Sequence, residues 1–333
     1  STTTTGKSGV LIDLPRINYD ANGENGALLL EPSRQQLIQF SEYFGAWDKV
    51  PSAITITDNA AISPEGVQNA AYVQFTAESQ YIKIDASGSS TTYTGSVWIK
   101  GTAGETIQLA VTGSDSGLKT LTGDWDRIEY TATGASLNLL IHTFGGATAR
   151  NVYIFGAMLE AGSYVSSYIP NHSGTGGVTR AADSCSVTGA SDVIGGTSGT
   201  IFFDIKTNKT LTSTNYKQFF YYSGVNSASS YMYISGNNYI VGNPSLGNIV
   251  SGTQLEADTQ YKVAITYKQN DFKLYINGSL SATRTSGSVI DAVDITSIGS
   301  YNGVSEFNEF QFNQYAHFQE VLSDSELATL TTL

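Results

Sequence analysis

The clearest candidates for chemistry lie in a polar row near the end of the chain. Four polar residues alternate with other residues between positions 310 and 318, and they are Gln311, Asn313, Tyr315 and His317. Alternate residues of a β-strand share a face, so these groups are predicted on one side, opposite Phe310, Phe312 and Phe318. The row could line a sugar-binding groove, or carry out β-elimination with Tyr315 and His317 as acid and base. The solvent-facing side of a sandwich strand accounts for the same residues, and we favour it over catalysis.

A second group of candidates is a set of tyrosines in the last third of the chain. Tyr231 and Tyr233 fall on one face of a predicted strand, with Met232 and Ile234 on the other. If the Met/Ile face is core, the two tyrosines are displayed to solvent. Together with two further candidates, Tyr239 and Asn237, they would suit a neutral sugar or a protein surface. The alternative, that tyrosine is simply abundant on β surfaces, explains the pattern equally well.

Paired carboxylates, which glycoside hydrolysis requires on either side of the scissile bond, are not evident. Asp204 has no acidic neighbour at an alternate position of its predicted strand. Glu306 and Glu309 are three residues apart, so on a strand they would point to opposite faces. Acidic residues in solvated turns are the favoured interpretation, and we predict that the protein is not an enzyme.

The sequence also gives little support for metal binding or thiol chemistry. The three histidines, His142, His172 and His317, lack the spacing of metal ligands. The single cysteine, Cys185, allows no internal disulfide and is expected to be a small buried residue. Asp- and Asn-rich turns could hold a structural Ca²⁺ on loop oxygens, although no EF-hand-like loop is present. No cofactor is therefore predicted, with a structural Ca²⁺ kept as an alternative.

The elements that must position these residues are β-strands, and residues 260–280 show this best. Tyr261, Val263, Ile265 and Tyr267 alternate with polar residues, and the alternation resumes after residues 269–271. Asn277-Gly278 then supplies two residues that tolerate positive φ, as a type I′ hairpin turn needs. This stretch predicts consecutive antiparallel strands with one apolar face and one solvated face.

Composition sets the limits on fold and partners. The 333 residues include 34 Gly and 20 Tyr but only 14% charged residues, which is typical of an all-β protein with a weakly charged surface. The net charge of −12 argues against nucleic acid, because phosphate binding needs clustered Lys and Arg. No apolar run reaches the length of a membrane span, so membrane insertion is not expected.

The spacing of strands and turns predicts two tandem antiparallel β-sandwiches. We expect a lead-in segment over residues 1–36, a jelly-roll domain over 37–172 and a second sandwich over 173–333. Only one short helix is expected, near the C-terminus. There Ser323 and Glu326 can form a capping box, and Leu322 and Leu327 a hydrophobic staple.

Several stretches carry a resemblance to a known class of proteins: Leu28-Leu29-Leu30-Glu31-Pro32-Ser33-Arg34-Gln35, Gly156 to Pro170, and Thr179 to Asp183. They resemble a modular pair that is common in phage tail and fibre proteins. In that pair a jelly-roll module similar to carbohydrate-binding modules precedes a concanavalin A-like (laminin-G-like) domain. The stretch from Val321 to Leu327 also resembles the close of laminin-G-like domains.

The resemblance implies a tail-fibre or surface adhesin, on a virion or extracellular, that binds host-surface glycans without catalysis. Other virion proteins are further expected partners. Fibre proteins are commonly trimeric, so a homotrimer is an alternative, although the chain has no coiled-coil heptads. The same fold also serves glycoside hydrolases and polysaccharide lyases, so a polysaccharide-degrading enzyme is the second hypothesis. Lyases on this fold use an arginine that the row 311–317 lacks. A purely structural virion decoration is the third.

Overall fold

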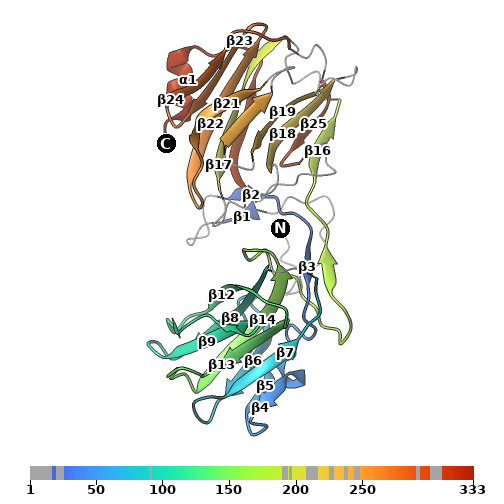
Figure 1. Ribbon diagram of the computed structural model, residues 1–333, viewed down its shortest axis with the longest axis vertical. Helices are drawn as coiled ribbons and strands as arrows, with labels where there is room; N and C mark the ends of the chain where they lie inside the picture. The colour runs from blue at the N-terminus through green and yellow to red at the C-terminus, as the bar shows by residue number, and fades with distance from the viewer. Residues whose placement is uncertain are drawn as a thin grey trace. The chain divides into compact units, whose positions relative to one another are not determined.

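The computed structural model describes residues 17–19, 26–89, 92–189, 194, 197–207, 217–224, 229–235, 239–243, 248–289, 293–300 and 310–333. The chain divides into two compact units, one built on Ser33–Ala181 and the other on Ala182–Leu333 with the described part of Asp13–Pro32. Each unit consists of antiparallel β-sheets packed face to face (Figure 1). The predicted all-β class with one short C-terminal helix is confirmed.

The first unit packs a five-stranded sheet, in the order β12-β8-β14-β6-β5, against a sheet in the order β10-β9-β13-β7-β4, where β11 also pairs with β9. The strands are β4 (Asp48–Val50), β5 (Thr55–Ile62), β6 (Gln68–Gln74), β7 (Tyr81–Asp85), β8 (Thr92–Gly101), β9 (Thr106–Val111), β10 (Ser114–Asp115), β11 (Lys119–Thr120), β12 (Asp126–Thr133), β13 (Asn138–His142) and β14 (Asn151–Ala161). A short 3-10 helix, η1 (Phe44–Ala46), precedes β4.

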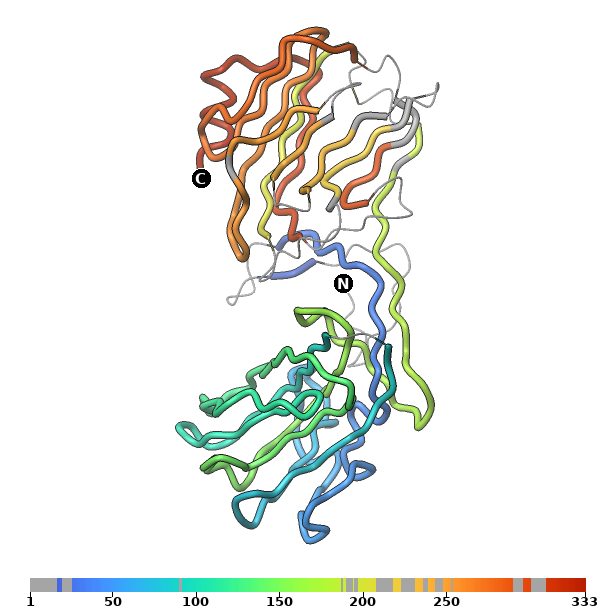
Figure 2. The backbone as a smooth tube through the Cα atoms, in the orientation of Figure 1, coloured from blue at the N-terminus to red at the C-terminus, as the bar shows by residue number. Residues whose placement is uncertain are grey.

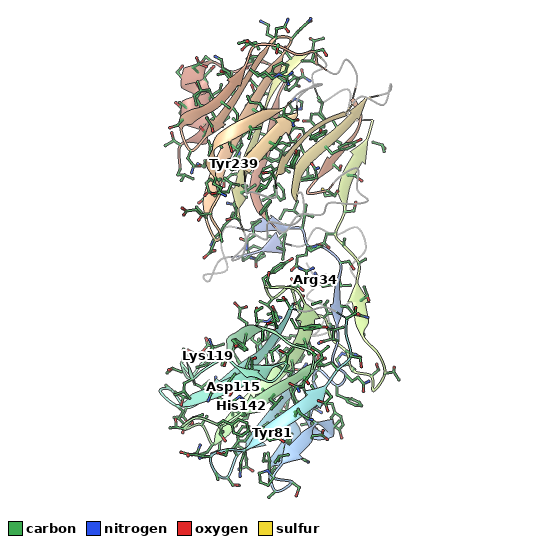
Figure 3. The ribbon with its side chains drawn as sticks, in the orientation of Figure 1. Arg34, Tyr81, Asp115, Lys119, His142 and Tyr239 are labelled. Carbon is green, nitrogen blue, oxygen red and sulfur yellow. The ribbon has the colours of Figure 1, made fainter. Side chains whose placement is uncertain are left out.

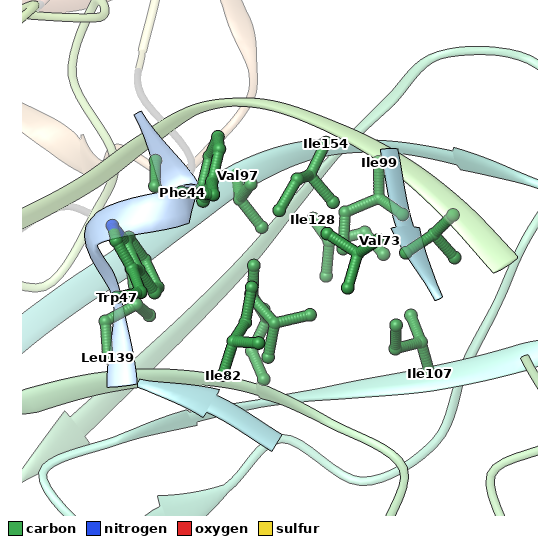
Figure 4. Close-up of a cluster of buried hydrophobic side chains, with 14 of the residues drawn as sticks. Phe44, Trp47, Val73, Ile82, Val97, Ile99, Ile107, Ile128, Leu139 and Ile154 are labelled. Atoms are coloured by element: carbon green, nitrogen blue, oxygen red, sulfur yellow. The ribbon is translucent and has the colours of Figure 1, made fainter. Parts of the chain in front are cut away.

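The core of this unit is filled by alternate residues of both sheets, as period-two patterning requires. Val97 and Ile154 come from the five-stranded sheet, and Ile82 and Leu139 from the facing sheet, and all four are fully buried. Figure 4 shows these side chains meeting between the sheets, with Phe44 and Trp47 beside them. Trp47 is therefore a packing residue of this core.

One end of the outer face of the five-stranded sheet is covered by the segment that follows β14. Glu160 is completely buried there and accepts hydrogen bonds from the backbone N–H and the hydroxyl of Ser166, each at 2.7 Å. The guanidinium of Arg34 lies 3.4 Å from Glu160 and compensates its charge. Tyr168 packs edge-on against Trp98 and Phe155. The stretch from Gly156 to Pro170, which carries part of the sequence resemblance, thus has a structural role, because its residues pack on the outer face of the sheet.

The two connecting segments of the first unit also pair with each other. β3 (Arg34–Gln36) and β15 (Val178–Arg180) form a two-stranded antiparallel ladder, although they lie far apart in the sequence. Figure 2 shows the two segments side by side.

The second unit packs a seven-stranded sheet, in the order β1-β2-β26-β17-β22-β23-β24, against a six-stranded sheet in the order β16-β25-β18-β19-β20-β21. The strands are β1 (Ile17–Asn18), β2 (Ala27–Leu29), β16 (Cys185–Thr188), β17 (Ser198–Lys206), β18 (Lys217–Gly224), β19 (Ser229–Ile234), β20 (Tyr239–Asn243), β21 (Ile249–Gln254), β22 (Gln260–Lys268), β23 (Asp271–Ile276), β24 (Ser279–Arg284), β25 (Val293–Ile298) and β26 (Gln311–Phe318).

The residues before β3 do not form the separate lead-in segment that was predicted over residues 1–36. β2 pairs with β26, so it extends the seven-stranded sheet of the second unit. Leu30 is buried in the core of that unit, and the backbone N–H of Glu31 donates to the carboxylate of Asp183 at 2.8 Å. Apolar side chains at Leu28 and Leu30 give this segment a reason to join the second core instead of remaining a separate lead-in.

The predicted hairpin over residues 260–280 is confirmed as β22 to β24. Val263, Ile265 and Leu274 are fully buried in the core between the sheets. Asn277 and Gly278 adopt φ values of 48° and 81°, as a type I′ turn requires. The predicted solvated face is wrong for its central part: Thr266 is fully buried and Tyr275 is 5% exposed.

The C-terminal helix, α1 (Asp324–Thr331), explains this difference, because it covers the outer face of the seven-stranded sheet. Leu327 packs there with Phe202, Ala264 and Tyr275. The expected capping box is present: the backbone N–H of Glu326 donates to the Ser323 hydroxyl, and the Ser323 N–H donates to the Glu326 carboxylate at 2.8 Å. Leu322 packs in the same cluster as Leu327, as the predicted staple requires.

Candidate functional site

The tyrosines predicted to be displayed lie on the outer face of the six-stranded sheet. Met232 and Ile234 are 0% and 1% exposed in the core, so strand alternation turns Tyr231 and Tyr233 outward. Both tyrosines are half-buried, and their ring centroids are 5.7 Å apart. The predicted orientation of the β19 side chains is therefore correct.

Tyr239 adds a third aromatic ring to this outer face. It begins the neighbouring strand β20, where Ile240 is fully buried and Tyr239 remains half-buried (Figure 3). Val241 lies opposite Tyr233 in the ladder, so it shares the outer face, where it is 5% exposed. Beneath the three tyrosines, Met232, Ile234 and Ile240 are packed in the core, and this layer holds the backbone of the face in place. Asn237, the remaining candidate of this group, lies outside the described residues.

The polar row on β26 is not on one face, and this prediction is wrong. The ladder between β17 and β26 shifts register between Asp204 and Ile205, because Asn313 is one residue more than the partner strand requires. Residues on either side of a bulge change faces relative to simple alternation. Phe312 and Tyr315, three residues apart, therefore both pack in the core between the sheets, while Phe318 packs in the cluster beneath α1.

The inward half of the row forms a buried aromatic network. His317 Nε2 lies 2.7 Å from the Tyr267 hydroxyl, and the hydroxyls of Tyr315 and Tyr222 are 3.3 Å apart. Gly199 stands opposite Tyr267 in the ladder, and a Cβ atom there would collide with the Tyr267 ring. Because Gly199 has no side chain, the Tyr267 ring has the space to lie there and contact His317.

Burial keeps this network neutral around pH 7. Desolvation raises the pKa of Tyr222 well above its ordinary value and also raises the pKa of Tyr315 and of Tyr267. Desolvation lowers the pKa of His317 to about 4, because the imidazolium would lose its hydration. A phenol this weakly acidic and an imidazole this weakly basic are poor partners for β-elimination at neutral pH.

The outward half of the row surrounds the one carboxylate on β17. Asn313 Nδ2 donates to Asp204 Oδ1 at 2.9 Å, and Gln260 Nε2 donates to the same atom at 2.9 Å. Asp204 is 8% exposed, so its carboxyl group is nearly buried and is held by these hydrogen bonds. Gln311 lies opposite Lys206, one position beyond this group. The four residues predicted to act together are therefore divided between two environments.

A histidine–aspartate pair in the first unit was missed by sequence reasoning. His142 is fully buried, its Nε2 atom lies 3.1 Å from Asp115 Oδ1, and its Nδ1 atom accepts the backbone N–H of Phe144 at 3.3 Å (Figure 3). Burial lowers the pKa of His142 despite the neighbouring carboxylate. The pair is brought together by the strand order β10-β9-β13, which no spacing in the sequence reveals. The contact between His142 and Asp115 holds the short strand β10 against the sheet.

Within the described ranges, no group of three or more His, Cys, Asp and Glu side chains is arranged to hold a metal ion. Glu306 and Glu309 lie outside those ranges. None of the helices that the structure describes is long and apolar enough to cross a membrane.

Comparison with solved structures gives matches of low identity. The carbohydrate-binding module CBM40 of the Ruminococcus gnavus IT-sialidase, bound to α2,3-sialyllactose, is 18% identical, with a TM-score of 0.39 over 45% of this chain and 92% of that one. The binding domain of botulinum neurotoxin serotype G is 15% identical, with a TM-score of 0.36 over 44% and 39%. Trypanosoma rangeli sialidase in complex with the inhibitor DANA is 14% identical, with a TM-score of 0.33 over 40% and 22%.

No curated protein matches the chain. Residues 191–328 match the family model described as the concanavalin A-like lectin/glucanases superfamily, Laminin_G_3. These residues lie in the second unit and include both strands of the tyrosine face, the aromatic network and most of α1. The second unit therefore carries a concanavalin A-like domain.

Proposed function

We propose that the protein binds glycans without catalysis, and that its second unit does so through the tyrosine face formed by Tyr231, Tyr233 and Tyr239. The observation that carries the proposal is the side-by-side placement of Tyr231 and Tyr233, half-buried on the outer face of a sheet whose inner face is core. Aromatic rings offer an apolar surface for the C–H faces of sugars, and tyrosine adds a hydroxyl for hydrogen bonding. The matching superfamily includes lectins, which supports this proposal.

The same superfamily includes glucanases, so the absence of catalysis needs its own support. Tyr315 packs against the core, and His317 contacts the Tyr267 hydroxyl there, so neither side chain stands on an outer face of the sandwich. Asp204 is held by two amide side chains, and no acidic side chain is among its hydrogen-bond partners within the described residues. A hydrolase would need a second carboxylate across the scissile bond. These arrangements favour binding over hydrolysis or elimination.

The test is retention of the purified protein on immobilised polysaccharides, followed by sizing of the recovered polymer. We expect the double variant Tyr231→Ala/Tyr233→Ala to weaken binding by about tenfold or more, since aromatic anchors dominate such interfaces. Tyr43→Ala is the matched control, because Tyr43 is an exposed tyrosine of the first unit. Unchanged binding in the double variant would refute the tyrosine face, and shortened polymer would refute the absence of catalysis.

The finer proposal is that this binding attaches a virion or a surface structure to host glycans. It is supported by the sequence resemblance to modular phage tail and fibre proteins, from which contact with other virion proteins also follows. The purified protein should then compete with phage particles for adsorption to host cells, and the tyrosine double variant should not. Competition by both proteins alike would point instead to a structural role that needs no sugar.

A further inference from the structure

The outer face of the five-stranded sheet in the first unit has two distinct halves. One half carries Trp98 and Phe155 and is covered by Tyr168 from the segment after β14. The other half carries Tyr72 on β6 and Tyr153 on β14, and both remain half-buried. Their neighbours in sequence, Val73 and Val152, are fully buried in the core, so alternation points both tyrosines outward.

Tyr72 and Tyr153 are the centre of a row that crosses four strands. The two residues are ladder partners, with ring centroids 4.9 Å apart and planes inclined by 38°. Thr57 on β5 lies opposite Tyr72, and Lys100 on β8 lies opposite Tyr153. With strands about 4.8 Å apart, the row from Thr57 to Lys100 spans roughly 14 Å, enough for a short oligosaccharide.

Polar but uncharged side chains border this row. Thr55, Gln74 and Asn151 form the next outward row of the same sheet, through the pairs Thr55 with Gln74 and Gln74 with Asn151. Hydroxyl and amide groups can donate to and accept from sugar hydroxyls. The two rows therefore combine apolar ring surface with neutral hydrogen-bonding groups.

Lys100 supplies the charge that selects among ligands. Its half-buried side chain has no ion pair or hydrogen bond with the residues that the structure describes. By contrast, Lys83 on the facing sheet lies 2.9 Å from the Asp85 carboxylate. In a chain of net charge −12, an ammonium beside a tyrosine pair is complementary to one negative charge, whereas a polyanion would be repelled overall.

We propose that the Thr57–Tyr72–Tyr153–Lys100 row is a second glycan-binding site that recognises an acidic sugar residue. The sugar ring packs on Tyr72 and Tyr153, and its carboxylate binds the Lys100 ammonium by a charge-assisted hydrogen bond. This site lies in the other unit from the tyrosine face of residues 231–239 and does not depend on it.

The experiment measures binding of the full chain to pairs of oligosaccharides that differ by one acidic group. The pairs end in glucuronate or glucose, in galacturonate or galactose, and in sialyllactose or lactose. At least one acidic member should bind about tenfold more tightly than its neutral partner. Lys100→Gln should remove that preference, while Tyr72→Ala/Tyr153→Ala should weaken binding of the acidic member itself. Lys83→Gln is the matched control and should change neither.

Two results would overturn this second site. One is equal binding of the acidic and neutral members in every pair. The other is an acidic preference that persists in both Lys100→Gln and Tyr72→Ala/Tyr153→Ala. The variant Tyr231→Ala/Tyr233→Ala separates the two proposals: it should reduce polysaccharide retention and leave the acidic preference in place. If that variant abolishes the acidic preference, the preference belongs to the second unit and the assignment to Lys100 is wrong.

Discussion

Acidification should destabilise the second unit through one histidine, and replacing that histidine should remove the effect. His317 is held between the sheets against Tyr267 and Tyr222, with its pKa lowered to about 4 by burial alone. Its ordinary pKa, about 6.5, applies to the unfolded chain. Between these values the unfolded chain binds a proton that the folded unit does not. The contribution of neutral His317 is therefore fully present above pH 6.5 and is lost as the pH falls toward 4.

The magnitude follows from the two pKa values. The interval from 6.5 to about 4 corresponds to at most about 3.4 kcal/mol, at about 1.36 kcal/mol per pKa unit. At pH 4.5 the linkage relation gives about 2.5 kcal/mol, because the folded form has begun to titrate. The imidazole is partly open to solvent, which screens its charge, so we reduce this figure by half to about 1.3 kcal/mol.

The assay compares wild type with His317→Gln in denaturant at pH 7.5 and pH 4.5. All three tryptophans, Trp47, Trp98 and Trp125, belong to the first unit, so their fluorescence follows that unit alone. Circular dichroism follows both units, and the transition that tryptophan does not report is that of the second. Carboxylate titration is common to both proteins and cancels in the comparison.

The stability gap between wild type and His317→Gln should shrink by about 1.3 kcal/mol on going from pH 7.5 to pH 4.5. Tyr267→Phe is the control: it removes the hydroxyl that contacts His317 but keeps the ring and the burial, so its pH dependence should resemble wild type. A gap between wild type and His317→Gln that stays the same at both pH values would falsify the assignment of a buried neutral imidazole.

Two further predictions use the same assay. Gly199→Ala should destabilise the second unit by about 1–3 kcal/mol, because the new Cβ would collide with the Tyr267 hydroxyl and lie 2.7 Å from the backbone oxygen of Phe318; an unchanged transition would show that the sheet relaxes there freely. Glu160→Gln should destabilise the first unit by about 2–4 kcal/mol and leave the second unchanged, because the amide has one acceptor oxygen where the carboxylate offers one to the Ser166 N–H and one to Arg34, and it removes the charge that Arg34 faces. Tryptophan fluorescence measures this second effect directly, and a loss below about 0.5 kcal/mol would contradict the compensated buried charge.

Local patterns in the sequence were sufficient for the regular elements. Period-two alternation and the Asn277-Gly278 turn predict β22 to β24, and Ser323 with Glu326 predicts the start of α1. These features depend on contacts within a few residues, so the chain itself records them. The packing of α1 on Ala264 and Tyr275 could not be predicted, because the local sequence of β22 and β23 does not indicate which distant segment will cover these strands.

The candidate site depends on strand registers that local sequence patterns cannot predict. A single additional residue at Asn313 changes the faces of the polar row, and only the partner strand β17 reveals it. Likewise, the ladder between β6 and β14 brings Tyr72 and Tyr153 together across about 80 residues of sequence. Registers between distant strands are set by the whole core and are not encoded locally.

The two units share a feature in how the outer faces of their sheets are covered. A segment of the same chain covers part of an outer face, α1 in the second unit and residues 163–171 in the first, and burying those aromatic and aliphatic side chains stabilises the fold. Half-buried tyrosine pairs lie on the remaining part of that face in the first unit and on the outer face of the other sheet in the second unit, with centroids 4.9 and 5.7 Å apart. Side chains that only stabilised the sandwich would gain more by being covered. Displayed tyrosine pairs on two otherwise well-packed sheets are therefore better explained by ligands than by folding, and binding should be sought on these faces and not between the sheets.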